Sequence, residues 1–165
     1  MSKPAAEMSK PAAALVKVRE WHIKALLDDL RPADALELAA IRGWSPAKEV
    51  RHAVATATHC ATCIVDGKVV AIFGDTRHDA VHGLPWMMSS TWINTSRRQF
   101  LAECPGVIAG MRSRHQLLIN MIDTRNTLAI RWLKWCGFTF LPAVPYGING
   151  ESFYPFTMEG TACAQ

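Results

Sequence analysis

The segment DTRNTLAIRWLKWCGFTF, residues 123–140, carries the clearest structural signal in this chain of 165 residues. It opens with Asp123 and Asn126, two residue types that cap helices, and it reaches Gly137, a residue type that ends them. Between them, five side chains recur at helical spacing: Leu128, Ala129, Trp132, Leu133 and Cys136. We therefore predict a helix that buries this face, followed by a strand that begins at Phe138.

The composition is that of an ordinary globular domain. Half of the residues are hydrophobic and 19% are charged, and a chain of this length can bury a core. No apolar run approaches the roughly 20 residues that cross a bilayer, and no secretory signal is recognisable, so we expect no membrane partner. The formal charge of +4 is too small to indicate nucleic-acid binding. Five scattered cysteines favour a reduced, cytoplasmic setting.

The first half of the chain contains signals for helices and for a hairpin. The repeated opening MSKPAAE-MSKPAAA predicts a flexible Ala/Pro tail over residues 1–14, ahead of a domain over residues 15–159 and a second tail over residues 160–165. Within the domain, residues 16–22 alternate like a strand and residues 23–42 follow a helical pattern that Pro32 divides. Ser45 and Pro46 start a further helix, and the Asp66-Gly67 pair predicts a hairpin turn between two strands.

The second half alternates strands and helices. Residues 84–93 are predicted as a strand, and a helix that begins near Ser96 is expected to be interrupted at Pro105. Residues 115–123 form a strongly apolar strand, and further strands are expected at 138–144 and 152–158. This mixed order predicts an α/β layered fold. It excludes a Rossmann domain, because no GxGxxG follows a strand.

Two clusters of potential metal ligands are better explained without a metal. Cys60 and Cys63 form a CxxC, but no second ligand pair exists, and the two side chains point to opposite faces of a strand. Four further potential ligands lie close together in a predicted loop, where a solvated surface is the simpler explanation: Asp75, His78, Asp79 and His82. We therefore expect no metal.

The order of elements, together with N-x-x-A-x-x-x-L-x-x-x-G-F at residues 126–138, resembles the GNAT acyltransferase superfamily. Within it, the chain is similar to the acetyltransferase-like proteins of short-tailed bacteriophages, some of them internal virion proteins. This similarity rests on six segments in order: DDLRPADALEL (28–38), DGKVVAIFGD (66–75), GLPWMMSSTWI (83–93), RRQFL (97–101), INMIDTRNTLAIRWLKWCGF (119–138) and GESFYPF (150–156). The resemblance implies a mixed, mostly antiparallel sheet with splayed central strands and with helices on both faces.

The resemblance also implies acetyl-CoA as cosubstrate. Its pantetheine is expected along the strand at residues 84–93, with contacts from Thr91, Trp92 and Ile93. Asn126 and Leu133, on the later helix between Asn126 and Gly137, are also expected to bind the cosubstrate. The CoA pyrophosphate is expected at the helix start formed by Ser96, Arg97 and Arg98, where free N–H groups meet an anion. Cations at a helix start are disfavoured, so the two arginines indicate either a bound anion or a solvated basic face.

Two positions depart from the superfamily pattern. The pyrophosphate loop usually contains glycines, and INTSRRQFLAEC contains none. The tyrosine that often protonates the departing thiolate is replaced by Leu133, which carries no proton to donate.

The candidates for the catalytic base are Glu20 on the first strand, His22 beside it, Ser89 and Ser90 on the fourth strand, and Asp123 at the end of the fifth; we favour Glu20, Ser90 and Asp123. Each has a structural alternative, since Glu20 can face solvent and Asp123 can serve as a turn or capping residue. Only one of Ser89 and Ser90 can face the cleft, because neighbours on a strand alternate.

Three functions remain open, of which one is a regulator that holds CoA as a structural ligand. The first is a phage-encoded, acetyl-CoA-dependent N-acetyltransferase that acts on an amine of a protein or small molecule in the cytoplasm of the infected host. The second is a catalytically degenerate GNAT-fold component of the virion, or a protein that binds a host factor.

Overall fold

The computed structural model describes residues 12–163, which contain both strands and helices. The predicted tail at residues 1–14 lies outside this range except for its last three residues, and residues 164 and 165 also lie outside it. The elements are, in order, β1 (Ala14–Val16), α1 (Glu20–Asp28), α2 (Pro32–Arg42), α3 (Pro46–Thr56), β2 (His59–Val65), β3 (Lys68–Arg77), β4 (His82–Ser89), the 3-10 helix η1 (Thr91–Asn94), α4 (Arg97–Arg114), β5 (Leu117–Asp123), α5 (Thr127–Cys136), β6 (Thr139–Phe140), β7 (Val144–Tyr146) and β8 (Glu151–Glu159).

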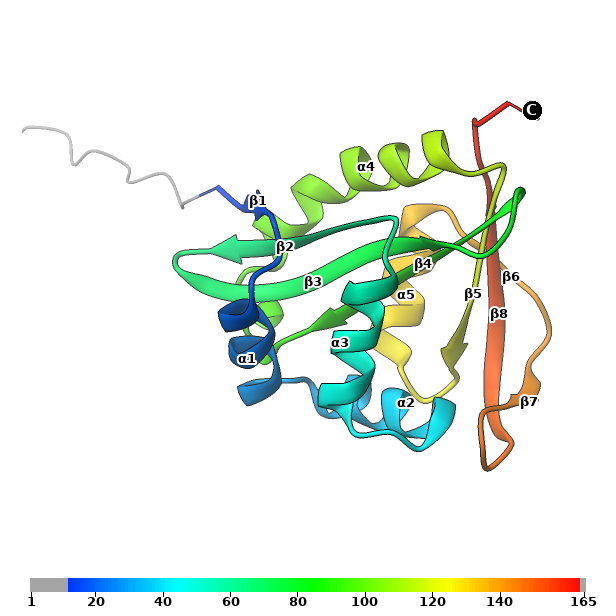
Figure 1. The fold of residues 1–165 in the computed structure, drawn as a ribbon, viewed down its shortest axis with the longest axis horizontal. Helices are drawn as coiled ribbons and strands as arrows, with labels where there is room; N and C mark the ends of the chain where they lie inside the picture. Colours follow the sequence, from blue (N-terminus) through cyan, green and yellow to red (C-terminus); the bar gives the residue numbers. More distant parts are fainter. Residues whose placement is uncertain (1–11, 164–165) are drawn as a thin grey trace, which may run out of the picture.

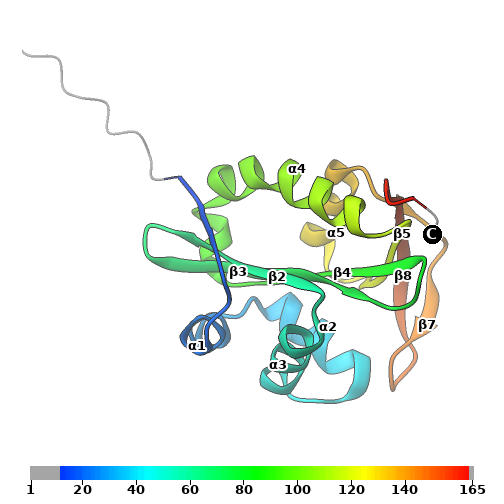
Figure 2. The same ribbon diagram turned by 45° about the horizontal axis from the view of Figure 1, so that its top comes forward.

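The strands form one sheet in the order β1-β2-β3-β4-β5-β8-β6, with β7 also paired to β8. All neighbours are antiparallel except β4 and β5, which are parallel. Helices α4 and α5 cover one face of the sheet, and α1, α2 and α3 cover the other (Figure 2). The predicted α/β fold, with a mixed and mostly antiparallel sheet between helices, is confirmed.

The two parallel strands separate soon after they meet. β4 and β5 pair only at His82 with Leu117 and at Gly83 with Leu118, and they diverge beyond that point (Figure 1). Pro85 accounts for the end of pairing, because it has no N–H to offer to β5. Its carbonyl oxygen instead accepts a hydrogen bond of 2.9 Å from the Asn120 side chain on β5. The sheet is therefore open at its centre, as the resemblance implies.

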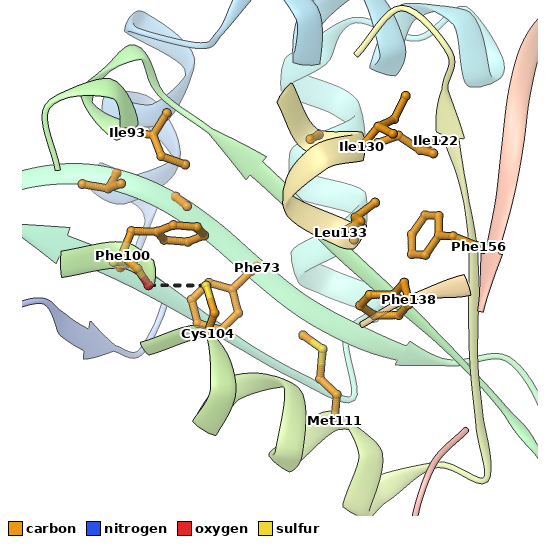
Figure 3. Packing of buried hydrophobic residues seen from close by; sticks show 14 of the residues in the cluster. Phe73, Ile93, Phe100, Cys104, Met111, Ile122, Ile130, Leu133, Phe138 and Phe156 are labelled. Atoms are coloured by element: carbon orange, nitrogen blue, oxygen red, sulfur yellow. Dashed lines mark hydrogen bonds between the residues drawn. The ribbon is translucent and has the colours of Figure 1, made fainter. Parts of the chain in front are cut away.

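The core consists of one apolar cluster on each face of the sheet. Under α4 and α5, Phe73 of β3 packs with Phe100, Leu133, Phe138 and Phe156 (Figure 3). On the other face, Leu26 of α1, Leu38 of α2 and Val50 of α3 pack on Ile72 and Met88. β3 supplies both clusters: Ala71 and Phe73 lie in the first, and Val69 and Ile72 lie in the second. The pairing of β2 and β3 shifts its register between Cys63 and Ile64.

Several local predictions are confirmed. Asp66 and Gly67 adopt positive φ values of 50° and 71° in the turn between β2 and β3. Ser45 caps α3 by accepting the Lys48 N–H at 3.3 Å. α5 begins after Asn126 and ends at Gly137, which has a φ of 99°. Its buried face is shifted, because Ile130 is buried while Leu128, Trp132 and Cys136 are half-buried.

The predicted strand at residues 16–22 is wrong beyond residue 16, because α1 starts at Glu20. The ring nitrogen Nδ1 of His22 accepts the N–H of Arg19 at 3.1 Å and lies 3.0 Å from the Thr62 hydroxyl. Burial, followed by the charge of Arg19, lowers the pKa of His22, which keeps the ring neutral as an acceptor. The alternation of residues 16–22 does not reveal this contact with a distant strand.

Three boundaries in the second half also differ from the prediction. β4 ends at Ser89, and Thr91, Trp92 and Ile93 belong to η1 instead of a strand. α4 runs through Pro105 without interruption, because Pro105 and Gly106 are exposed and solvent can satisfy the freed carbonyl. The strand expected at 138–144 is split into β6 and β7 around Pro142.

The loop between β7 and β8 packs on the end of α2. The N–H of Ile148 donates to the Ala40 carbonyl at 3.2 Å, and Gly147 has a φ of 77°. A Cβ on Gly147 would lie 2.0 Å from the Ala40 carbonyl oxygen, so only glycine allows this approach.

Replacing Gly147 with alanine is therefore expected to destabilise the protein by about 1–3 kcal/mol, from the positive φ and the backbone clash together. Chemical denaturation measures the loss. Gly67→Ala is the matched control, because its φ of 71° is similar and nothing lies within 4 Å of the added Cβ. A Gly147→Ala loss no larger than that of Gly67→Ala would show that the loop is not held against α2.

Candidate functional site

A cavity of about 280 Å³ occupies the central opening of the sheet. On one face it is lined by α2 and α3, through residues that include Glu37, Ile41 and His52. On the other face it is lined by α4 and α5, through residues that include Trp132 and Leu133. Because its walls come from both faces, the cavity connects the two sides of the sheet between β4 and β5.

The edge of β4 that faces this opening is partly unpaired. The carbonyl of Pro85 and the N–H of Ser89 both bond on the β5 side of β4, to Asn120 and Asp34 respectively. Met87 lies midway between them, and alternate residues of a strand direct their N–H groups to the same side. The N–H of Met87 is therefore aimed into the cavity that its side chain also lines.

A buried polar network closes the wide end of the opening. Asp34 on α2 is the centre of this network: its carboxylate accepts from the Ser89 N–H at 2.8 Å, the Ser89 hydroxyl at 2.8 Å and Arg31 at 3.1 Å. Arg31 also donates to Asn126 at 3.3 Å. Both members of the Arg31–Asp34 pair are buried, so the two charges depend on one another for stabilisation.

Asn126 joins this network to Glu37. Its amide nitrogen donates to Asp34 at 3.2 Å and to Glu37 at 3.1 Å, while its oxygen accepts from Arg31. Asn126 precedes α5 as predicted, but its side chain makes no capping hydrogen bond. All of its amide groups are thus engaged by other side chains of the protein.

Glu37 is the carboxyl group in this cavity whose pKa is displaced toward neutrality. Burial raises the pKa of Glu37 to about 7, and the neighbouring charges of Asp34 and Asp123 also raise it. Hydrogen bonds from Asn126 and from the Asp123 N–H, at 3.3 Å, act in the opposite direction but are weaker. Part of the residue reaches solvent, while its carboxylate is enclosed by these donors. A carboxylate with a pKa near neutrality is suited to accept and release protons.

The end of β4 is paired with a segment from the α1–α2 corner. The Arg31 N–H donates to the Ser89 carbonyl at 3.1 Å, and the Thr91 N–H donates to the Asp29 carbonyl at 2.8 Å. Leu30 and Ser90 thereby form an antiparallel bridge. Residues 29–31 consequently occupy part of the β4 edge along which the resemblance places a pantetheine chain. On this edge they leave the backbone N–H of Met87 accessible.

The three residues predicted as catalytic lie away from the open part of the cavity. Glu20 is exposed at the start of α1 and pairs with Arg51 at 2.5 Å, so its placement on a strand is wrong. Ser90 is buried and its hydroxyl donates to the Val69 carbonyl at 2.6 Å. Asp123 is buried, and although its burial opposes ionisation, hydrogen bonds from Arg125 outweigh it and hold the Asp123 pKa below its usual range. Asp123 serves as the turn residue before α5, accepting the Arg125 N–H at 2.9 Å.

The residues predicted to bind the cofactor fall into two groups. Asn126 and Leu133 line the cavity. Thr91 and Trp92 are exposed on η1, Ile93 is buried in the core, and the Trp92 indole donates to Asp29 at 3.0 Å. Trp92 therefore stands beyond the opening and does not offer its N–H from a strand edge.

The start of α4 retains the features of an anion site. Ser96 is buried at the N-cap and makes no side-chain capping bond, and the first turn holds no acidic residue. Arg97 and Arg98 are both exposed there. The first N–H groups of a helix lack intrahelical acceptors, so this end of α4 can receive a negatively charged group.

Sequence reasoning missed Glu37 and Asp34. A signal was present: Asp34 and Glu37 stand three residues apart, and Leu38 and Ile41 continue the same side of the helix. Carboxylates on the buried side of a helix are rare unless they are paired or functional. The distant partners Ser89 and Asn126 could not be identified from helical spacing.

Neither candidate metal cluster is assembled. Asp79 bonds to His82 at a strand start, whereas Asp75 is buried on β3 between Arg114 and His115. Within residues 12–163 no three His, Cys, Asp or Glu side chains group as metal ligands, and all five cysteines are free thiols. No helix in this part of the chain has the length and apolar character needed to span a bilayer.

Comparison with known proteins relates the chain to acetyltransferases by structure. No protein-family model matches the sequence, and no curated protein matches it. A GCN5-related N-acetyltransferase from Kribbella flavida is 16% identical, with a TM-score of 0.67 over 90% of this chain and 98% of that one. Phosphinothricin acetyltransferase from Sinorhizobium meliloti, solved with acetyl-CoA, is 12% identical, with a TM-score of 0.66 over 93% and 92%. Spermidine N-acetyltransferase from Vibrio cholerae, solved with CoA and spermine, is 9% identical, with a TM-score of 0.59 over 90% and 95%.

These likenesses span whole chains, and they establish that the protein has the GNAT fold. Because the sequence identities are only 9–16%, these likenesses show the fold alone.

Proposed function

We propose that the protein is an acetyl-CoA-dependent N-acetyltransferase with Glu37 as its general base. The observation that carries this proposal is the cavity that passes through the sheet and holds a carboxyl group with a pKa of about 7. Such a cavity lets a thioester enter from the α4–α5 side while an amine approaches from the α2–α3 side. The proton acceptor stands on the amine side, where a base is required.

Glu37 accepts a proton from the incoming amine, and the neutral nitrogen attacks the carbonyl carbon of the thioester directly. The N–H of Met87 donates to the carbonyl oxygen as negative charge develops on it. The Leu133 side chain has no acidic proton to donate, so solvent protonates the departing thiolate. Acetyl-CoA supplies the acetyl group, and Ser96, Arg97 and Arg98 at the start of α4 hold its pyrophosphate.

In this proposal Asn126 positions Glu37 and does not bind the cosubstrate, because its amide groups are already engaged. Thr91, Trp92 and Ile93 contact the chain of the cosubstrate only after residues 29–31 release the end of β4. Met87, and not one of these three residues, supplies the N–H donor to the thioester carbonyl.

A second candidate function is a GNAT-fold binding or virion protein without catalysis. Two observations favour it: Leu133 in place of a proton donor, and the occupation of the β4 edge by residues 29–31. The phage origin that the sequence segments suggest belongs to both candidates, and the acceptor in the first is an amine of a host or phage molecule.

Acetyl-CoA is expected to raise the melting temperature of the wild-type protein. A ligand that binds only the folded state adds about 2.7 kcal/mol at a hundredfold excess over Kd, which is readily seen as a thermal shift. Arg97→Glu together with Arg98→Glu should abolish this shift by repelling the pyrophosphate. Calorimetric titration of both proteins provides the binding constants.

Arg51→Glu is the control for charge reversal, because Arg51 is also exposed but lies on α3, and it should retain the shift. An absent shift and absent heat at millimolar acetyl-CoA would refute the enzymatic proposal in favour of the second candidate. A shift that survives the double arginine variant would instead mean that the pyrophosphate binds elsewhere.

A further inference from the structure

The lining of the cavity is acidic, although the chain as a whole is basic. The described residues that line the cavity include four carboxylates: Asp34, Glu37, Glu49 and Glu103. Arg42 is the one Lys or Arg among these lining residues. The formal charge of the full chain is +4, so the excess of acidic residues in the cavity is opposite in sign to the net charge of the chain.

Arg42 is not free to receive a negatively charged group. Its guanidinium forms two hydrogen bonds with the carboxylate of Glu49, one of them at 3.1 Å from Nε to Oε1. It also lies over the ring of Trp44, at 4.6 Å from the centroid. Glu49 is 2% exposed, so breaking this pair would leave a carboxylate buried without its partner. A substrate carboxylate would therefore find no available lysine or arginine among the residues that line this side of the cavity.

Glu37 is the carboxylate on this side that has no cationic partner. Asp34 is neutralised by Arg31 and Glu49 by Arg42. A substrate with one ammonium group would thus meet one carboxyl group, and a second ammonium group would find no second unpaired carboxylate here. Glu103 lies on α4, on the opposite face of the sheet.

The remaining wall on this side is mostly apolar and aromatic, with His52, Thr56 and Thr76 among its polar members. Trp86 contributes its indole ring, whose N–H is already satisfied by the Thr76 hydroxyl at 3.1 Å. Tyr146 lies at the exposed rim with its ring packed edge-on to Phe153, and Ile41 completes this wall. Aromatic faces attract an ammonium group as well as an apolar body. The volume of about 280 Å³, shared with the thioester end, limits the substrate to a small molecule.

We propose that the acceptor is a small primary amine with a single positive charge, an apolar or aromatic body and no carboxylate. This inference rests on the proposed acetyltransferase function and specifies its substrate class. Amino acids are disfavoured because Glu37 would repel their carboxylate and Arg42 is already paired with Glu49. Polyamines are disfavoured because their second ammonium group would find no second unpaired carboxylate.

Direct binding to the full chain, without acetyl-CoA, tests this preference separately from catalysis. Phenethylamine and phenylalanine differ only by a carboxylate, and spermidine supplies additional positive charge. Calorimetric titration at neutral pH should show phenylalanine at least about tenfold weaker than phenethylamine, because like charges oppose each other in the cavity. Spermidine should bind no more tightly than phenethylamine. Stronger binding of phenylalanine or spermidine, or no binding of phenethylamine, would overturn the inference.

A gain-of-function variant tests the electrostatic cause. Thr56 is exposed at the mouth of the cavity near the end of α3, where a cation is compatible with the helix. Thr56→Lys should raise the affinity for phenylalanine several-fold relative to phenethylamine. Ala55→Lys is the matched control, because Ala55 is the exposed neighbour on α3 that does not line the cavity, and its affinity ratio should stay at the wild-type value. Equal effects of the two lysines would refute a local charge preference.

Product formation with acetyl-CoA, measured by mass spectrometry, separates this inference from the proposed function. Binding of phenethylamine without its acetylation, together with no acetylation of any amine, would leave the preference standing and refute the enzyme. Acetylation of phenylalanine or spermidine in preference to phenethylamine would leave the enzyme standing and refute the preference.

Discussion

Replacing Glu37 with glutamine is expected to lower kcat/KM for amine acetylation by about 10²–10⁴-fold, the range that general bases contribute. Glutamine keeps the shape of the side chain and can still accept from Asn126 and the Asp123 N–H, but it cannot take a proton from the amine. The wild-type kcat/KM should fall as pH drops below about 7, following protonation of Glu37. The residual activity of Glu37→Gln should lack that acid limb.

Glu20→Gln separates this base from the one predicted from sequence. Glu20 is exposed and paired with Arg51, so its variant should keep both the rate and the acid limb. A large loss in Glu20→Gln, with activity retained in Glu37→Gln, would reverse the assignment. Acetyl-CoA binding is measured on both variants, so that a slower reaction can be distinguished from weaker binding of the cosubstrate.

The substitution Glu37→Gln should also change how the free energy of unfolding depends on pH. The pKa of Glu37 is about 7 in the folded protein and lies near 4.5 in the unfolded chain, so the folded state resists ionisation. Stability therefore falls as pH rises from about 4.5 to about 7, because the unfolded chain releases its proton first. Glu37→Gln should be more stable than the wild type by about 1–3 kcal/mol above pH 7, and the difference should vanish below about pH 4.5. Denaturation curves across this range measure it, and a difference independent of pH would mean that Glu37 is not buried as a neutral acid.

Asp34→Ala should destabilise the protein by about 3–5 kcal/mol, because it leaves the buried guanidinium of Arg31 without its partner. It also removes the acceptor of the Ser89 N–H and of the Ser89 hydroxyl, both buried at the end of β4. Chemical denaturation provides the change in the free energy of unfolding.

Double substitution identifies the source of this loss. Arg31→Met combined with Asp34→Leu removes both charges and should recover much of the stability, since a buried ion pair can be replaced by apolar side chains at little cost. A double variant as unstable as the sum of the two single variants would instead assign the loss to the hydrogen bonds at Ser89. If residues 29–31 must leave the β4 edge for the cosubstrate, the folded double variant should also bind acetyl-CoA more tightly than the wild type.

Local signals in the sequence were sufficient to predict the turns and helix ends that depend on a few neighbouring residues. Asp66-Gly67 forms the expected turn, Ser45 caps α3, and Gly137 ends α5, because each needs only a backbone conformation that its own side chain favours. The order of these elements, together with the segment at residues 126–138, resembles the GNAT superfamily, and the fold that this resemblance implies is confirmed. The start of α1 was missed because His22 is held by Thr62, which lies 40 residues away.

The candidate site was predicted only in part. Asn126 and Leu133 line the cavity because α5 borders the opening of the sheet, which the order of elements implies. Glu20 was misplaced with the strand to which it was assigned, and Glu37 was missed. The network of Arg31, Asp34, Ser89 and Asn126 joins three separate parts of the chain, so no local pattern contains it.

The sequence by itself determined the periodicity of the helices, the turns and the order of elements, since these follow from steric and hydrophobic preferences of neighbouring residues. Only the tertiary structure decided which carboxyl group is poised to exchange protons. The pKa of Glu37 depends on burial and on charges that approach it from the end of β5 as well as from its own helix. Solvent exclusion and electrostatic interaction act through space, and the distances involved are not fixed until the chain has folded.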